Sequence, residues 1–370
     1  MNKPKQKKLI EVSNLSVCFD TDEGRVQAVR DVSFYIRTGE IIGVVGESGS
    51  GKSVTTSTLL GWVPGAPGIV SGEVTYYDEM ELPHELFSIE KIDAIKNYKK
   101  KGKEDPIISE YELSKRFKKY RHDQISMIFQ EPKRYLHPFW SVEKHFKTIL
   151  IPLNGETLKE LATPFLEIVG LNVGDIWNLY PHNLSGGMNQ RLMISLALSR
   201  SPRILIADEM TTGLDVTTQV RLAEMLSKLI EDAEDENRAI IMISHDIAFV
   251  LKIVNVLMVM YAGDIVEFGP AHLFYDDDQE DNHPYTNALL NVFYSETGAF
   301  IEGDVPSSIN PPRGCPFRER NCPVYKANMN EIGHLCEQER PQKYFTKDSQ
   351  GHWVRCHKFL IKPWSDIVSS

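Results

Sequence analysis

The chain has 370 residues, of which 42% are hydrophobic, and its 41 Lys and Arg side chains face 51 Asp and Glu, for a net charge of −10. This length allows two domains or one large domain with an appendage, and the acidic balance argues against general nucleic-acid binding. No apolar run reaches the ~18 residues of a membrane-spanning helix. The basic start MNKPKQKK lacks the apolar segment of a secretory signal, so we expect the chain in the cytoplasm.

Strand-like and helical segments alternate along the chain. Residues 9–36 have short alternating runs and a turn at 21–24, which predicts an antiparallel β layer. Apolar, β-branched runs then predict buried parallel strands, and the segments that follow two of them predict helices. The alternation predicts an α/β fold with a mainly parallel core sheet. The predicted strands are 41–45, 125–129, 203–207 and 240–244, and the predicted helices are 53–63 and 188–199.

Two segments break this alternation. Residues 78–122 are rich in Lys and Glu, which favours a solvated insertion with some helix; a docking surface for a partner is the alternative. From 276 onward an acidic run, a Pro-rich stretch and four cysteines follow one another. We therefore predict a domain over 1–275, with a helical subdomain at about 136–190 inside it, and a C-terminal extension over 276–370.

The stretch GESGSGKS has the spacing G-x-x-x-x-G-K-[ST] of a phosphate-binding loop. Glycines let successive backbone N–H groups curl round a phosphate, and the start of the following helix adds a positive dipole end. Lys52 would reach the β- and γ-phosphates of a nucleotide, and the Ser53 hydroxyl would bind Mg²⁺. The predicted nucleotide-binding residues of this loop are Gly46, Glu47, Ser48, Gly49, Ser50, Gly51, Lys52 and Ser53.

Two further motifs carry the same chemistry. The apolar strand in RILIADEM ends in Asp208 and Glu209. The first carboxylate would hold Mg²⁺, and the second would polarise the attacking water as a general base. Ser185, Gly186 and Gly187 begin a predicted helix and form a second candidate anion site. Two anion sites and one acidic pair indicate a nucleotide clamped between two protomers.

These motifs resemble, in order and across residues 9–275, the ATP-binding subunit of an ABC transporter. LSGGM resembles the family's signature, with Met188 where the family commonly has glutamine. The resemblance implies a P-loop ABC ATPase core that binds ATP and Mg²⁺. It also implies that the signature completes the site of a partner cassette, and that closing and reopening two cassettes moves membrane subunits.

The same resemblance assigns four more residues. Gln130 in IFQEP would help to arrange Mg²⁺ and water, and His245 in ISHD would sense the γ-phosphate. Asp215 ends the segment TTGLD, which resembles the family's D-loop, and Phe19 sits where the family stacks an aromatic ring on adenine. Together with Glu209, these residues imply an active ATPase.

Four segments resemble the oligopeptide and dipeptide importers within this family. They are SGGMNQR, VMYAGDIVEFGP, HPYTNALL and GCPFRERNCP. The resemblance implies a second ATPase subunit, expected to be a paralogue in a heterodimer, two integral membrane permease subunits and an extracytoplasmic substrate-binding protein. The chain would then lie at the cytoplasmic face of the cell membrane as a peripheral subunit, without a nucleic-acid partner.

Two departures from the branch leave alternatives open. His137 stands where the family usually has asparagine, and the 78–122 insertion is longer than we expect. Some relatives in this branch are similar to importers of sugars or nickel. Two alternatives belong to other functional classes. One is a soluble ABC protein that acts in translation or DNA repair, and the other is a regulatory subunit that does not hydrolyse ATP.

Four of the five cysteines lie close to the C-terminus. In a reducing compartment such clustering favours a metal site over disulfides, but the Cys-x₂₋₄-Cys pair usual for structural zinc is absent. Four thiolates suit a 4Fe-4S cluster, and the resemblance implies the same. Zn²⁺, with His334, His352 or His357, and plain buried thiols or disulfides remain the alternatives, and Cys18 is expected in the core. The predicted cluster ligands are Cys315, Cys322, Cys336 and Cys356.

Overall fold

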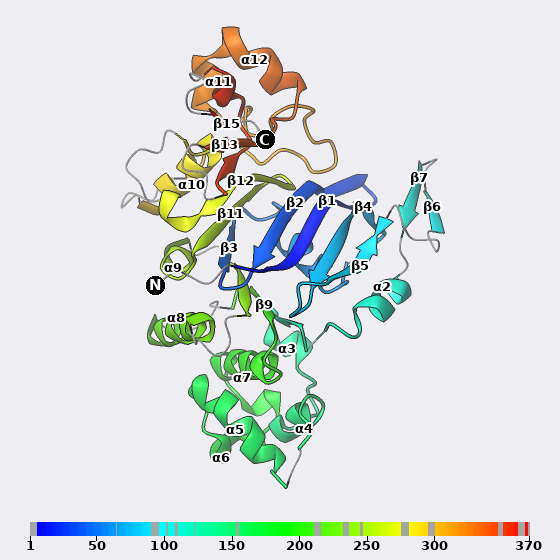
Figure 1. Ribbon diagram of the computed structural model, residues 1–370, viewed down its shortest axis with the longest axis vertical. Coiled ribbons are helices and arrows are strands. Elements are labelled where there is room, and N and C mark those ends of the chain that lie inside the picture. The colour runs from blue at the N-terminus through cyan, green and yellow to red at the C-terminus, as the bar shows by residue number, and fades with distance from the viewer. Residues whose placement is uncertain are drawn as a thin grey trace. The chain divides into compact units, whose positions relative to one another are not determined.

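The chain divides into two compact units, and Figure 1 labels their helices and strands. Unit 1 comprises Met1–Lys7, Arg37–Ile41 and Phe117–Ser244; unit 2 comprises Lys8–Ile36, Ile42–Arg116 and His245–Ser370. A computed structural model describes residues 6–63, 65–89, 96–100, 103–107, 110–121, 123–152, 155–210, 216–231, 237–244, 247–274, 281–294, 300–346, 351–361 and 367–368.

Unit 1 contains three parallel strands whose side chains are all buried. They are β8 (Ile125–Ile128), β9 (Ile204–Asp208) and β10 (Ala239–Ile243). β9 lies in the middle and pairs in parallel with both neighbours. A parallel strand that is covered on both faces needs an unbroken apolar run. The three apolar runs of the sequence therefore predict these strands to within one residue at each end.

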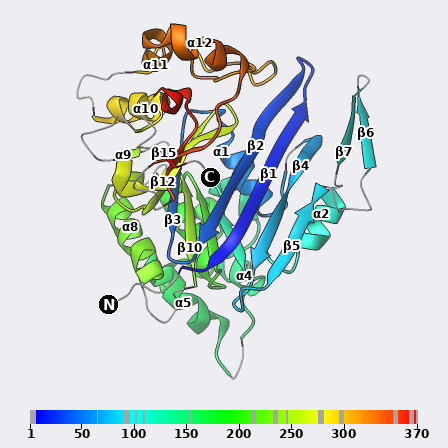
Figure 2. The same ribbon diagram turned by 45° about the horizontal axis from the view of Figure 1, so that its top comes forward.

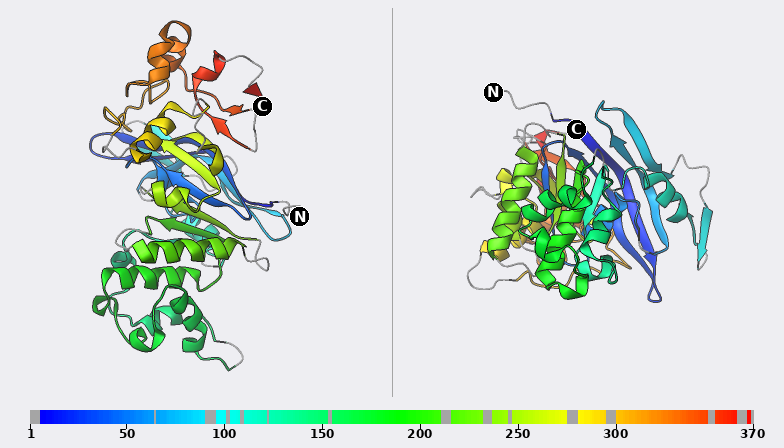
Figure 3. Two further views of the ribbon diagram at one scale, coloured as in Figure 1. Left: turned by 90° about the vertical axis from the view of Figure 1, so that its left-hand side faces the viewer. Right: turned by 90° about the horizontal axis from the view of Figure 1, so that it is seen from below.

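The chain between β8 and β9 is largely helical, and its green helices gather into one group in Figure 3. Phe146, Leu166 and Leu192 are fully buried in an apolar core shared by α4, α5 and α7. The described part of residues 136–190 thus contains several helices; its status as a helical subdomain stays a prediction. The helices are α3 (Pro132–Tyr135), α4 (Val142–Lys147), α5 (Leu158–Ile168), α6 (Val173–Ile176), η2 (Pro181–Asn183) and α7 (Gly186–Leu198), and α8 (Val216–Glu231) follows β9.

Unit 2 contains the antiparallel layer that the sequence predicts. Its strand order is β2-β1-β4-β5, and the four strands lie side by side in Figure 2. The turn between the first two strands is closed by Thr21, whose N–H and hydroxyl both donate to the carbonyl of Gly24, at 2.9 and 2.8 Å. The strands are β1 (Lys8–Asp20), β2 (Arg25–Arg37), β4 (Pro67–Tyr77) and β5 (Pro83–Ser88).

A further set of paired strands in unit 2, which belongs to a nine-stranded sheet, combines early and late parts of the chain. Residues 42–45 of β3 (Ile41–Val45) pair in parallel with β11 (Val256–Tyr261), and β11 pairs antiparallel with β12 (Asp264–Pro270). β12 pairs with β14 (Trp353–Val354), so chain from both sides of residue 275 shares this sheet. The domain boundary near 275 stays a prediction. β13 (Tyr344–Thr346) and β15 (Ile367–Val368) complete this part of the sheet.

The charged segment 78–122 contains β5, a hairpin and a helix. The hairpin pairs β6 (Lys96–Lys100) with β7 (Lys103–Ile107), as Figure 2 shows, and α2 (Glu110–Phe117) follows. Helix within this insertion is therefore confirmed. The remaining helices of unit 2 are α1 (Lys52–Thr58), α9 (Ile247–Leu251), η4 (Ala271–Phe274), α10 (Pro284–Tyr294), α11 (Pro323–Ala327), α12 (Met329–Gln338) and η5 (His357–Leu360).

Within the described ranges, every helix is too short or too polar to cross a lipid bilayer.

A buried carboxylate in unit 1 makes the stability of the fold depend on pH. The side chain of Glu40 is 3% exposed, and it accepts a hydrogen bond of 2.7 Å from the backbone N–H of Arg37. Burial raises the pKa of Glu40 from 4.5 to about 7, although the hydrogen bond and the charge of Arg37 oppose that rise. The folded chain therefore holds this proton more tightly than the unfolded chain does.

We expect Glu40→Gln to stabilise the protein at pH 8 but much less at pH 5. Because the folded pKa is raised, the free energy of unfolding falls as the pH rises from 4.5 to about 7. Removing the ionisable group should recover about 1–3 kcal/mol at pH 8. Urea unfolding at both pH values measures the effect, with the exposed Glu167→Gln as the control. An equal gain at both pH values would contradict the assignment.

Candidate functional site

The loop between β3 and α1 can only be made with glycines at two positions. Gly46 has φ 146°, and a Cβ there would lie 2.1 Å from the carbonyl oxygen of Met260. Gly51 has φ 97°, and its Cβ would lie 2.4 Å from the carbonyl oxygen of Ala28. Any side chain at either position would collide with backbone. The strand, loop and helix occur in the order that the sequence predicts.

Lys52 lies across this loop. Its Nζ donates to the carbonyl oxygens of Gly46 and Glu47, both at 2.8 Å, and lies 3.4 Å from the hydroxyl oxygen of Ser50. The loop is also tied to the strands beside it, since the carbonyl of Ser50 accepts a hydrogen bond from Gly263 at 3.1 Å. The arrangement leaves one ammonium group held over a compact, glycine-rich turn, as a phosphate-binding loop requires.

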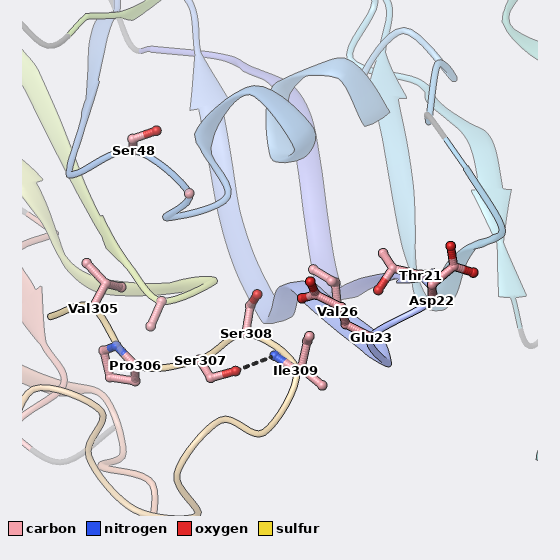
Figure 4. A pocket seen from close by; sticks show the side chains of 12 residues that line it. Thr21, Asp22, Glu23, Val26, Ser48, Val305, Pro306, Ser307, Ser308 and Ile309 are labelled. Carbon is pink, nitrogen blue, oxygen red and sulfur yellow. Dashed lines mark hydrogen bonds between the residues drawn. The ribbon is translucent and has the colours of Figure 1, made fainter.

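A cavity of about 650 Å³ opens beside this loop, as Figure 4 shows. Its lining includes the turn between β1 and β2 and the adjacent segment 305–309 from the C-terminal part of the chain. That segment is fixed to the hairpin, because Gln27 N donates to Ser308 O at 2.8 Å. The cavity is lined by Thr21, Asp22, Glu23, Val26, Ser48, Gly49, Ala262, Val305, Pro306, Ser307, Ser308 and Ile309.

Phe19, the predicted adenine-stacking residue, lies at the end of β1 in the same unit. It is paired in the sheet with Pro67 of β4. Its ring lies close to the backbone of Gly65, where an added Cβ would approach the ring to 3.1 Å. The ring is partly buried, which leaves one part of it accessible to a ligand.

In unit 1, the structure joins Gln130 and Glu209, two residues predicted for the same chemistry. The Nε2 of Gln130 donates a hydrogen bond to Oε2 of Glu209. Glu209 follows the buried Asp208 at the end of β9 and has φ 47°, a left-handed conformation that is costly for a residue with a side chain. Its N–H is held by the carbonyl of Ile243 at 2.9 Å. Strain of this kind often marks a functional position.

The predicted signature residues form the start of α7. Ser185 is the N-cap, and its hydroxyl accepts the N–H of Met188 at 3.2 Å. Apart from its chain neighbours and the backbone of its own helix, no described atom lies within 4 Å of the place where a Cβ on Gly186 would be. Nothing in the described part of this chain therefore requires glycine there. Met188 packs against the apolar core of the helices, which accounts for an apolar side chain at this position.

His245 and Asp215, the other two residues predicted by resemblance, lie outside the described residues.

The four C-terminal cysteines are neighbours of one another in unit 2. All four are free thiols, each 6% exposed. Burial raises the pKa of every one, to about 11 for Cys336 and about 12 for Cys356, and repulsion from the other cysteines raises the pKa of Cys315 as well. Cys315 N donates to Cys336 O at 2.8 Å, which joins the first and third cysteine segments. Cys322 caps α11.

Buried positive charge accompanies these thiols. Lys358 is 7% exposed, and its ammonium counteracts the burial that raises the pKa of Cys322 and Cys356. Arg318 donates to the carbonyl of Cys336 at 3.3 Å. A buried set of thiols with adjacent cations suits a centre that carries negative charge.

The residues that the structure describes support neither the cluster nor the zinc alternative by their geometry. No group of three or more His, Cys, Asp or Glu side chains among them is placed to hold a metal ion. Two of the three histidines have other partners. His352 bonds to Glu267 at 2.9 Å, and Nε2 of His357 bonds to the carbonyl of Glu339 at 3.0 Å, whereas the buried Nδ1 of His357 has no hydrogen-bond partner among the described residues. Cys18 lies buried in β1, as expected for a core residue.

The sequence did not indicate two residues that contact the phosphate loop. Arg320 donates hydrogen bonds to the carboxylate of Glu47. The backbone N–H of Glu47 donates to the hydroxyl of Tyr285 at 2.9 Å. Both lie inside segments that carry the family resemblance. Nothing in their spacing relates them to residue 47, which lies more than 230 positions away for each of them.

Comparison with known proteins agrees with these features. Residues 29–212 match the family model described as ABC transporter. The oligopeptide transport ATP-binding protein OppD of Escherichia coli is 36% identical over 91% of this chain and 90% of its own length. The dipeptide transport ATP-binding protein DppD of the same organism is 34% identical over 94% and 96%.

Solved structures agree on the fold. The dimeric structure of MJ0796, a bacterial ABC transporter cassette, matches with a TM-score of 0.55 at 23% identity, and covers 71% of this chain and 99% of that one. The chain therefore belongs to the ABC transporter family, among the ATP-binding proteins of oligopeptide and dipeptide transport.

Proposed function

We propose that this chain is the ATP-hydrolysing motor subunit of an ABC importer for oligopeptides or dipeptides. The observation that carries the ATPase assignment is the hydrogen bond between Gln130 and Glu209 at the end of a buried strand, with Glu209 in a strained backbone conformation. The peptide assignment is supported by the relatives, which are named as oligopeptide and dipeptide transport ATP-binding proteins.

The binding roles follow from the phosphate loop. The N–H groups of residues 46–53 would hold the phosphates, and Lys52 would exchange the carbonyls of Gly46 and Glu47 for phosphate oxygens. Phe19 would stack on adenine. Ser53, Gln130 and Asp208 would hold Mg²⁺, which neutralises phosphate charge during the reaction.

The hydrolytic roles fall to three side chains. Glu209 would take a proton from the attacking water, and its carboxylate is oriented by the amide of Gln130. His245 would sense the γ-phosphate. General-base catalysis needs a carboxylate fixed within hydrogen-bonding reach of the water, and a fixed left-handed backbone at Glu209 serves that requirement.

The signature would act on a second ATPase subunit. The open space at Gly186 lets another molecule approach the start of α7 closely, and Ser185, Gly187 and Met188 flank that point. Asp215 would belong to the same contact. We propose a paralogue as the second subunit, and a second copy of this chain is the alternative. The N–H groups at the start of this helix suit the phosphates of the nucleotide bound to that subunit.

The remaining partners follow from the class of transporter. Two integral membrane subunits would form the pathway, and an extracytoplasmic binding protein would deliver the peptide. The chain would then lie peripherally on the cytoplasmic face of the membrane. An importer for a sugar or for nickel is the second candidate, because substrate choice would reside in those partner subunits.

We expect Glu209→Gln to reduce ATP hydrolysis by about 10²–10⁴-fold while ATP binding persists, since only the general base is lost. The measurement is phosphate release by the assembled transporter, together with the amount of ATP retained by the complex. Glu167→Gln on the exposed face of α5 is the matched control and should hydrolyse ATP at the native rate. Native-rate hydrolysis by Glu209→Gln would remove that residue from the mechanism.

The substrate class is tested with the assembled transporter in proteoliposomes. We expect binding protein loaded with a short peptide to stimulate ATP hydrolysis, because substrate delivery promotes closure of the two ATPase subunits. Binding protein without peptide is the control. Stimulation by a sugar or by nickel in place of peptides would reassign the substrate and leave the ATPase assignment intact.

We also propose that Cys315, Cys322, Cys336 and Cys356 hold a 4Fe-4S cluster. The four thiols are buried together, and the ammonium of Lys358 lies close enough to affect two of them. When bound, such a cluster supplies a covalent link between chain segments and a one-electron redox centre. The residues present fit this group, because Cys₄ ligation and local positive charge are what the cluster requires.

Anaerobic purification should yield close to four irons and four sulfides per chain, with visible absorbance near ~400 nm. Cys322→Ala should lose this absorbance because it removes a ligand. Cys18→Ala, which changes a buried cysteine in β1, is the matched control and should retain it. A chain that binds no iron in both forms would refute the cluster and leave the ATPase assignment standing.

A further inference from the structure

Arg320 attaches the phosphate loop to the cysteine-bearing segment 315–322. We propose that Arg320 is a positioning residue for the phosphate loop, so that this segment determines how tightly the loop binds ATP. The inference rests on the proposed nucleotide role of residues 46–53. Arg320 would act on the nucleotide site only through its contact with Glu47.

The side chain of Arg320 is fixed by burial and by hydrogen bonds to residues outside the phosphate loop. Its side chain is 3% exposed, and its two terminal nitrogens donate to the two carboxylate oxygens of Glu47, with Nη2 to Oε1 at 3.3 Å. Nη2 also donates to the carbonyl of Ile301 at 2.8 Å, and Nε to that of Glu302 at 3.2 Å. A guanidinium fixed on three sides presents a rigid fork to the carboxylate.

The backbone of Glu47 is fixed from the same part of the chain. Its N–H donates to the hydroxyl of Tyr285 at 2.9 Å. Tyr285 is fully buried, and its ring packs against those of Tyr261 at 4.4 Å and Phe317 at 5.5 Å. Phe317 lies between Cys315 and Cys322, the first two of the four C-terminal cysteines. Segment 315–322 therefore supports residue 47 at its side chain and, through Tyr285, at its backbone.

Glu47 passes this constraint on to Lys52. Its carbonyl oxygen accepts a hydrogen bond from Nζ of Lys52 at 2.8 Å, beside the equivalent bond to Gly46. The position of residue 47 thus helps to define where the loop places its phosphate-binding ammonium. A loop that is ordered before binding loses less conformational entropy when the ligand arrives. Releasing Glu47 would remove that advantage and leave its carboxylate without its bidentate partner.

A purely structural role for Arg320 makes a different prediction. In that case its loss would lower the melting temperature and the yield of folded chain, but folded protein would bind nucleotide normally. A positioning role instead changes nucleotide affinity in folded protein, raises the KM for ATP and leaves kcat nearly unchanged. The two are separated by measuring affinity and stability on the same samples.

The experiment uses the full chain and titrates MgADP and MgATP into wild type and variants by calorimetry. We expect Arg320→Ala to weaken binding about tenfold because the loop loses its preorganisation. Arg320→Lys should restore part of the affinity, since a single ammonium cannot bond both carboxylate oxygens. In the assembled transporter, the KM for ATP should rise with kcat within about twofold.

Two further variants make the test decisive. Glu47→Ala removes the same ion pair but leaves the bonds of Arg320 to the carbonyls of Ile301 and Glu302, and it should weaken binding as much as Arg320→Ala. The double variant should be no weaker than either single one, because both remove the same bond. Arg313→Ala is the matched control: it removes an exposed arginine from the chain just before this segment, and it should bind nucleotide like wild type.

Wild-type affinity in folded Arg320→Ala would overturn the inference, as would additive losses in the double variant. If Arg320→Ala fails to fold, wild-type affinity in Glu47→Ala overturns it equally. A wild-type chain that binds neither nucleotide would instead overturn the proposed function of residues 46–53, so the two failures are distinguishable.

Discussion

The close approach of backbone to backbone at Gly46 and Gly51 is the constraint on which the candidate site depends. At these positions the loop lies against the carbonyls of Met260 and Ala28, at distances that leave no room for a Cβ. The contact forces the turn between β3 and α1 to be tight, and the tight turn brings the carbonyls of Gly46 and Glu47 under Nζ of Lys52. A buried strand on one side and a helix on the other hold the ends of the turn. The chemistry of phosphate binding therefore follows from a packing restriction.

Unit 1 obtains its functional geometry differently. There a buried apolar strand, β9, delivers Asp208 and Glu209 to its end, and the hydrogen bond from Gln130 fixes the carboxylate that would activate water. The start of α7 combines a serine cap with a glycine that faces open space. Both features depend on ends of regular elements, where backbone and side-chain groups are not committed to internal hydrogen bonds.

Side-chain contacts, as well as strand pairing, join the C-terminal part of the chain to the part that contains the nucleotide loop. Its strand β14 pairs with β12, and its segment 305–309 lines the cavity beside Ser48. Arg320 forms an ion pair with Glu47. A centre that organises the four cysteines would thus organise the chain that holds the loop. Direct contacts thus connect the cysteine-bearing segment with the glycine-rich loop.

The sequence by itself determined the chemistry that depends on short spacing. The loop at 46–53, the strand ending in Asp208 and Glu209 and the capped helix at Ser185 are local patterns, because each is built from residues within one turn or strand. The buried runs likewise predicted the parallel strands to within a residue, since burial on both faces permits only apolar side chains. Tertiary structure alone decided that Arg320 and Tyr285 hold residue 47, that Gln130 bonds to Glu209, and that four widely spaced cysteines share one buried region. Such contacts join residues distant in sequence, and their partners are selected by packing and charge in the folded chain, which no local pattern encodes.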